Sequence, residues 1–112
     1  MNPSPTLQEI QSIVDGWIKA HGGYFSPLTN LAMLAEEVGE LARVMARTYG
    51  DQVAKPGDER DISEEIADIL WVLTAIANQT GTSLTESFSR TIQKKTVRDA
   101  KRFTSKTDKN LE

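Results

Sequence analysis

The sequence predicts an all-α protein of four helices. Helix-capping signals recur along the chain, apolar residues between them follow helical spacing, and no segment shows the alternation of a β-strand. The 112 residues, of which 38% are hydrophobic, suit one soluble domain with a modest core. We therefore expect a single domain over residues 1–112, in which the polar segment 104–112 forms a flexible tail.

The first two helices are predicted from their start signals. Thr6 and Glu9 have the spacing of a capping box, which opens a helix that ends before the sequence HGG. Ser26 and Pro27 are typical of an N-cap followed by the first helical position. The second helix should end at Gly50, because glycine is the usual residue just beyond a helix.

The next two helices follow the same logic. Asp61 can cap a third helix that runs to about Gln79. Ser83 and Glu86 have capping-box spacing and open a fourth helix that reaches about Phe103. Because about three residues join the third helix to the fourth, we expect these two helices to pack as antiparallel neighbours.

Composition excludes several classes of function. The chain has no cysteine, which excludes disulfides and thiolate metal sites and favours a cytoplasmic location. The N-terminus lacks the pattern of a signal peptide, and the longest apolar stretch is too short to span a membrane. The net charge of -3 argues against a nucleic-acid polymer as partner. We therefore expect no membrane and no nucleic-acid polymer among the partners.

Charge is unevenly distributed along the chain. Ten of the sixteen acidic residues lie within residues 36–68, and eight of the thirteen basic residues lie within residues 90–109. This asymmetry indicates one segment that holds cations and another that holds phosphates. Solvated helix faces of opposite sign are the alternative.

Two pairs of carboxylates stand out within this acidic segment. Glu37 and Glu40 are three residues apart on the second helix, and Glu65 and Asp68 repeat the spacing on the third. Both pairs interrupt apolar rows, and Asp68 is the only charged residue within 66–77, so we expect it inside the protein. If the two helices are antiparallel, all four acids can meet, and their repulsion then calls for a cation.

The chemistry of these side chains favours a hard cation. Carboxylate oxygens suit Mg²⁺, with Mn²⁺ as the alternative. The only histidine, His21, lies outside both acidic pairs, which disfavours zinc and a di-iron centre. The plainer alternative is solvated charge, because a single pair of this kind on a helix usually has no ligand.

The chain resembles the MazG-type all-α nucleoside triphosphate pyrophosphohydrolases. The family signature is E-x-x-E, a spacer, and E-x-x-D; here EVGE is followed by twenty-four residues and then EIAD. The flanking segments GYFSPLTNLAMLAEEVGELA and EEIADILWVL, and a basic fourth helix ending in KRF, also fit. The resemblance extends over almost the whole chain.

This resemblance implies a Mg²⁺-dependent hydrolysis of nucleoside triphosphates between the α- and β-phosphates. It implies that the four paired acids hold the metal ion, and that the protein forms homodimers or tetramers with sites near subunit contacts. Glu36 and Glu64 adjoin the paired acids and are open to three interpretations: ligands of a further ion, groups that polarise water, or surface charges.

For the phosphates, the resemblance implies contacts from the fourth helix. Arg102 matches an arginine that precedes an aromatic residue in the family, and either Lys94 or Lys95 matches a lysine. The chain departs from the family at the position of its asparagine, where Thr96 or Asp99 stands, depending on alignment. Helical spacing also places Arg98 in one basic row with Lys94 and Arg102, although the helix dipole alone favours basic residues at a helix end.

Aromatic residues are the candidates for a base pocket. Trp71 follows Asp68 by three residues, and further aromatic side chains lie near the end of the first helix. Stacking on a base is one use for them, and packing in the core is the other. The members of this second group are Trp17, His21, Tyr24 and Phe25.

Three functions remain open from the sequence. The first is a Mg²⁺-dependent nucleotide pyrophosphohydrolase that removes unwanted nucleotides. The second is the related phosphoribosyl-ATP pyrophosphohydrolase, which shares scaffold and chemistry. The third is a non-catalytic helical module that uses the acidic surface to bind a partner.

Overall fold

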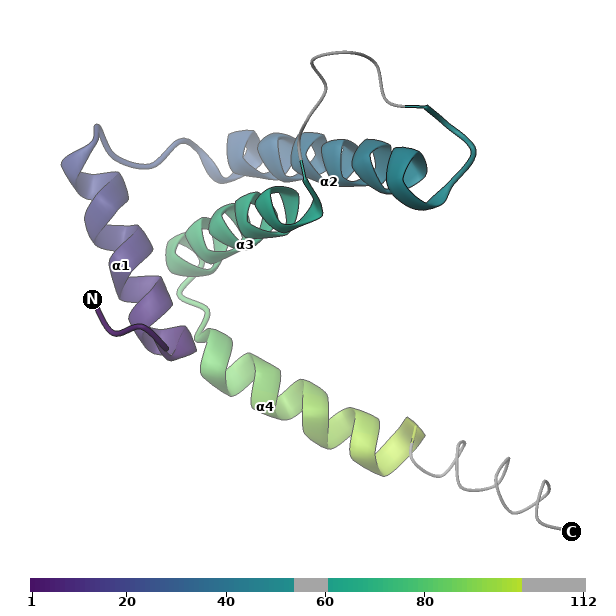
Figure 1. Ribbon diagram of the computed structural model, residues 1–112. Helices are drawn as coiled ribbons and strands as arrows, with labels where there is room; N and C mark the ends of the chain where they lie inside the picture. Colours follow the sequence, from purple (N-terminus) through teal and green to yellow (C-terminus); the bar gives the residue numbers. More distant parts are fainter. Residues whose placement is uncertain (54–60, 100–112) are drawn as a thin grey trace, which may run out of the picture.

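The computed structural model describes residues 1–53 and 61–99, and within them the chain contains helices and no strand. Figure 1 shows the helices in chain order. The predicted all-α fold of four helices is confirmed, whereas the predicted tail and the end of the fourth helix at Phe103 lie outside the described residues. The helices are α1 (Leu7–Ala20), α2 (Pro27–Tyr49), α3 (Ile62–Gln79) and α4 (Leu84–Lys94), which continues into a π-helical segment, η1 (Lys95–Asp99).

Each helix begins at its predicted cap. The four cap side chains each accept a hydrogen bond from the backbone N–H three residues later, which satisfies a donor that the helix itself cannot pair. At Thr6 the box is complete, because the Glu9 side chain also accepts from the Thr6 N–H. The four caps are Thr6, Ser26, Asp61 and Ser83.

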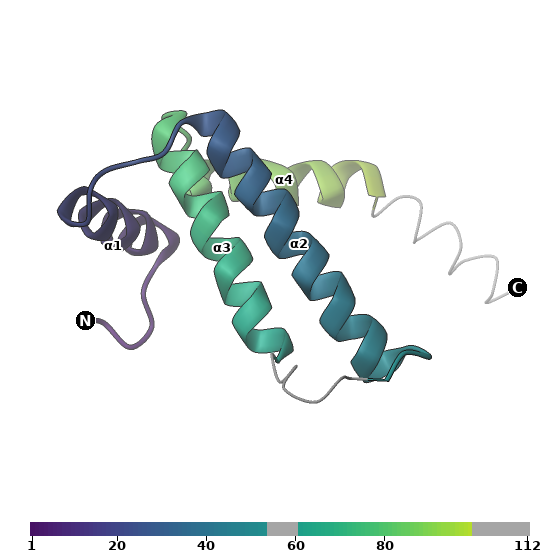
Figure 2. The ribbon, with the colours of Figure 1, turned by 90° about the horizontal axis from the view of Figure 1, so that it is seen from above.

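The antiparallel pair of α2 and α3 forms the centre of the fold. Figure 2 shows the two helices side by side, with the start of α3 near the end of α2. Val44 of α2 and Val72 and Ala75 of α3 are buried, and α1, in which Val14 is buried, packs on α3. Along the described part of the chain, no helix has both the length and the apolar character that a membrane span requires.

The path of α4 differs from the predicted one. Within the described residues α4 packs on α1, and it leads away from α2 and α3 instead of folding back along α3 (Figure 1). Gln11 of α1 explains this path, because its side chain donates to the carbonyl of Thr82 at 2.9 Å and accepts from the N–H of Leu84 at 3.0 Å. The expectation of antiparallel α3 and α4 is therefore wrong: a short loop permits that packing, but contacts with α1 direct the helix elsewhere.

The cap of α3 predicts a pH-dependent contribution to stability. Hydrogen bonds from the Ser63 hydroxyl and the Glu64 N–H hold the pKa of Asp61 below its ordinary value. Because the folded pKa is lowered, the contribution is full above the ordinary pKa of about 3.9 and is lost as pH falls through the folded value. We expect the free-energy difference between wild type and Asp61→Asn to shrink in urea unfolding below about pH 4. A difference that stays constant through this range would contradict the assignment.

Candidate metal and nucleotide site

Three carboxylates from two helices gather between α2 and α3. Glu37 of α2 and Glu65 and Asp68 of α3 each offer an oxygen, and these three oxygens lie within 4.8 Å of one another. Glu65 is 1% exposed, Glu37 is half-buried and Asp68 is exposed. The group therefore opens to solvent on one side, with a buried carboxylate at its base.

The burial of the two α3 acids differs from the prediction. Asp68 was expected inside the protein, but it faces solvent, and Glu65 is the buried member of the pair. The reason is the rotation of α3: the face that packs on α2 includes Glu65 and Val72, and Asp68 lies at its margin. The apolar residues around α3 therefore do not by themselves indicate which face of this helix is buried.

Glu40 is not a member of this group of three. Its Oε1 lies 3.5 Å from Arg43 Nη2, one turn along the same helix. Glu36 and Glu64, which adjoin the paired acids in sequence, are both exposed and also lie outside the group. The structure therefore brings together three of the four predicted ligands, and the roles of Glu40, Glu36 and Glu64 stay predictions.

The donor set fits a hard divalent cation. Mg²⁺ is usually held by one or a few carboxylates, with water and substrate phosphates as its other ligands. Three convergent carboxylates, one of them buried, supply the charge that a divalent ion balances. Among the described residues, the group contains no histidine and the chain has no cysteine, so its chemistry does not match a zinc site.

A cavity lined by aromatic side chains borders α2 and α3, the two helices that carry the acids. It has a volume of about 310 Å³, and its walls come from the end of α1, the segment that follows it, α2 and α3. The aromatic residues that the sequence singled out all line it: Trp17, His21, Tyr24, Phe25 and Trp71. An apolar cavity with a few polar groups is the usual form of a small-molecule site.

Helical spacing connects this cavity to the carboxylates. On α2, Met33 lines the cavity and Glu37 follows it by one turn. On the antiparallel α3, Val72 lines the cavity and Asp68 precedes it by one turn. The cavity and the acidic group are therefore consecutive parts of one groove between the two helices.

The aromatic rings are arranged around Trp17. His21 stacks on it with a centroid distance of 4.0 Å, and Trp71 meets it edge-on at 5.3 Å. The Nδ1 of His21 lies 2.7 Å from the Trp17 carbonyl, and since a carbonyl can only accept, Nδ1 carries the proton. This hydrogen bond and the stacking fix the orientation of the His21 ring.

Tyr24 joins the cavity wall to a polar network. Its hydroxyl donates to Asp15 and accepts from the side-chain amide of Asn78 at 3.1 Å. Burial and the adjacent Asp15 carboxylate raise the pKa of Tyr24. The hydrogen bond from the Tyr24 hydroxyl, together with Lys19, lowers the pKa of Asp15. At neutral pH the phenol is thus a fixed, neutral donor to Asp15.

The described members of the predicted phosphate-binding residues lie on other elements than the acids. Lys94, Lys95 and Arg98 are exposed on α4 and η1, and Arg102 lies outside the described residues. Lys94 and Arg98 line a surface hollow of about 450 Å³ together with Arg90. Lys94, Lys95 and Arg98 therefore lie on a segment that, within the described residues, leads away from the helices that carry the acids (Figure 1).

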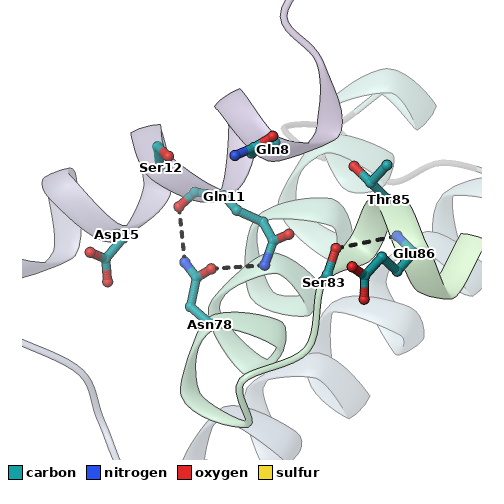
Figure 3. A pocket seen from close by; sticks show the side chains of 8 residues that line it. All are labelled: Gln8, Gln11, Ser12, Asp15, Asn78, Ser83, Thr85 and Glu86. Carbon is teal, nitrogen blue, oxygen red and sulfur yellow. Dashed lines mark hydrogen bonds between the residues drawn. The ribbon is translucent and has the colours of Figure 1, made fainter.

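Another hollow, of about 580 Å³, lies where α1, α3 and α4 meet (Figure 3). Its polar groups bond to one another: Gln11 and Asn78 exchange two hydrogen bonds of 3.0 Å, one through each side-chain amide. Asn78 is ten residues from Asp68, about 15 Å along the helix. The network therefore holds three helices together at some distance from the acidic group.

Asn30 also lines the aromatic cavity and was not singled out from the sequence. It is 5% exposed, and its side-chain amide donates to Gln79 at 2.8 Å. A signal was available, because Asn30 precedes Glu37 by seven residues and so shares its helix face. Buried polar residues at such spacing are informative, since burial of an amide is costly without partners.

Comparison with known proteins agrees with this fold. Residues 25–103 match the model of the MazG nucleotide pyrophosphohydrolase domain. The chain belongs to this family and is a pyrophosphohydrolase. It is 43% identical over 103 residues to the uncharacterised Bacillus subtilis protein YpjD, covering 90% of this chain and 93% of YpjD.

Two solved structures are similar over most of the chain. The crystal structure of Bacillus subtilis YpjD, described as a candidate pyrophosphatase, has a TM-score of 0.73 and 42% identity, covering 81% of this chain and 95% of that one. The crystal structure of the Bacillus-conserved MazG protein, a nucleotide pyrophosphohydrolase, has a TM-score of 0.70 and 36% identity, covering 82% and 90%. The predicted family resemblance is confirmed.

Proposed function

We propose that this protein hydrolyses nucleoside triphosphates to monophosphate and pyrophosphate with Mg²⁺, or alternatively Mn²⁺, as cofactor. One observation carries the proposal: the three carboxylates and the aromatic cavity lie one helical turn apart in the same groove. A nucleotide has two ends that suit these two parts: a flat base for the aromatic cavity, and phosphates for a metal ion held by the carboxylates. We assign the whole chain, residues 1–112, to this one catalytic domain.

Each part of the groove has a role in this reaction. Glu37, Glu65 and Asp68 would hold the metal ion, and Glu40 would join them if its side chain turned from Arg43. Bound Mg²⁺ would neutralise phosphate charge and lower the pKa of water. The water oxygen would form a bond to the α-phosphorus while the bond from that phosphorus to the bridging oxygen breaks; pyrophosphate leaves and the proton of the water passes to solvent. The faces of Trp17 and Trp71 would position the base.

We also propose that the protein is a homo-oligomer. Large apolar side chains stay exposed in regular stripes on both central helices. Those of α2 recur every seven residues, and those of α3 follow helical steps of four and three, so each stripe covers one face. A second copy would cover both stripes. The residues are Leu31, Val38 and Met45 on α2, and Ile66, Leu70 and Leu73 on α3.

The direction of α4 supports a shared site. Its basic residues lie on a segment that leads away from α2 and α3, so in a homo-oligomer this segment can reach phosphates bound by another copy. Phe88 and Ile92 on α4 are likewise exposed and are suited to packing on a partner. Lys94, Lys95, Arg98 and, beyond the described residues, Arg102 would then act in trans.

Mixing two inactive variants tests this arrangement. We expect a chain with Glu65→Gln and a chain with Lys94→Ala and Arg98→Ala to be inactive alone. Refolded together in equal amounts, they should regain about a quarter of the wild-type activity. About half of the dimers are then mixed, and each mixed dimer contains one intact site of two. No recovery from oligomers shown to be mixed would assign the basic residues to their own chain, and a monomeric mass in light scattering would exclude the oligomer.

Two other functions are separated from this proposal by their products. Removal of unwanted nucleotides is the role that we infer for a triphosphate pyrophosphohydrolase of this kind. Phosphoribosyl-ATP as the preferred substrate would indicate the related histidine-pathway reaction. A folded protein that turns over neither substrate would indicate a binding module.

The test is a panel of standard and modified ribo- and deoxyribonucleoside triphosphates, assayed with and without Mg²⁺. Separate detection of pyrophosphate and phosphate identifies the bond that breaks. We expect pyrophosphate release that requires the metal ion and is lost in Glu37→Gln. Release of phosphate with a nucleoside diphosphate would contradict the proposal.

A further inference from the structure

We infer that Asn30 selects nucleotides whose base carries an amino group at the end of the ring far from the sugar. Cytosine and adenine have this group, whereas uracil and hypoxanthine have a carbonyl oxygen in its place. The inference rests on the proposed function only in so far as the aromatic cavity holds the base. It adds to that function a rule for which bases are accepted.

The orientation of the Asn30 side chain is determined by two hydrogen bonds in series. The main-chain carbonyl of Phe25 can only accept, so the side chain of Gln79 must present its NH2 group there. The Oε1 of Gln79 then faces Asn30, which must present its own NH2 group, at 2.8 Å. The Oδ1 of Asn30 is therefore the polar atom left for the cavity.

This oxygen is an acceptor that the described protein groups leave without a donor. Asn30 is 5% exposed and lines the cavity, and among residues 1–53 and 61–99 no hydrogen bond reaches its Oδ1. Water in the cavity can donate to this oxygen, and a bound base that displaces the water must supply a donor in its place or lose affinity. An N–H of a bound base would supply this donor, while a carbonyl at the same place would put two acceptors against each other.

The position of Asn30 along α2 sets which end of the base it meets. It lies seven residues before Glu37 on the same helix face, about 10 Å along the axis. The span from the far edge of a nucleobase to its α-phosphate is of this size. With phosphate near the carboxylates, the group opposite the glycosidic bond of a pyrimidine therefore reaches Asn30.

The test compares substrate analogues that differ only in this group. Non-hydrolysable α,β-methylene analogues of CTP and UTP form one pair, and those of ATP and ITP form a second. Binding in the presence of Mg²⁺ is followed by tryptophan fluorescence. Trp17 and Trp71 are the two tryptophans of the chain and both line the cavity, so the signal reports this site.

We expect the amino member of each pair to bind at least about tenfold more tightly than its partner. Asn30→Leu should remove this preference by weakening the CTP and ATP analogues. Gln79→Leu should remove the preference in another way. Without Gln79, the Asn30 amide could rotate and donate to the carbonyl of the base, so the UTP and ITP analogues should bind more tightly. A purely structural role for Gln79 would produce no such gain.

The outcomes separate this inference from the proposed function. Equal binding of both members by the wild type, no binding of any analogue, or a preference that survives in Asn30→Leu would overturn the role of Asn30. Preference for the amino members in a protein that releases no pyrophosphate would support the role of Asn30 and overturn the proposed reaction. Pyrophosphate release by a protein that binds both members of each pair equally would support the proposed reaction and overturn the role of Asn30.

Discussion

Replacement of Glu65 by glutamine is expected to lower metal-dependent pyrophosphate release by more than about 100-fold. The variant keeps the shape of a side chain that is 1% exposed, but it removes the charge at the base of the carboxylate group. An amide is a weaker ligand for a hard cation than a carboxylate. Turnover of the triphosphate panel at saturating nucleotide measures the effect.

A second readout distinguishes loss of metal from loss of structure. A ligand that binds only the folded protein raises its thermal midpoint, so Mg²⁺ should stabilise the wild type and not Glu65→Gln. The matched control is Glu86→Gln, which makes the same change at an exposed carboxylate in the first turn of α4. Equal stabilisation of wild type and Glu65→Gln by Mg²⁺ would refute the assignment of Glu65 as a ligand.

The largest effect on stability is expected from Asn78→Leu. The Asn78 side chain accepts from Gln11, donates to the Gln11 carbonyl, and donates to the Tyr24 hydroxyl (Figure 3 shows the first two). Leucine is likewise branched at Cγ but leaves these groups without their partner in a partly buried place. We expect a loss of about 2–4 kcal/mol in the free energy of unfolding, measured in urea at fixed protein concentration.

Asn2→Leu is the control for this variant. Asn2 is exposed, and its amide lies 3.4 and 3.5 Å from the Glu9 carboxylate oxygens, so its loss should change the free energy of unfolding by less than about 0.5 kcal/mol. Similar values for the two variants would show that the bonds joining α1 and α3 contribute little.

The sequence by itself determined the helices and the candidate ligands. The caps at Thr6, Ser26, Asp61 and Ser83 lie where predicted, because a cap depends on groups three residues apart. The spacing within each pair of acids is equally local, and the family resemblance it supported is confirmed. A short-range rule sufficed for each of these features.

The tertiary structure alone decided how these helices combine. Gln11 contacts the start of α4 across 73 residues of sequence, and the bond from Asn30 to Gln79 spans 49. Such contacts determine the path of α4, the burial of Glu65 instead of Asp68, and the place of Asn30 in the wall of the cavity. The physical reason is that these outcomes depend on which helix faces meet, and many pairings of amphipathic faces are compatible with one local pattern.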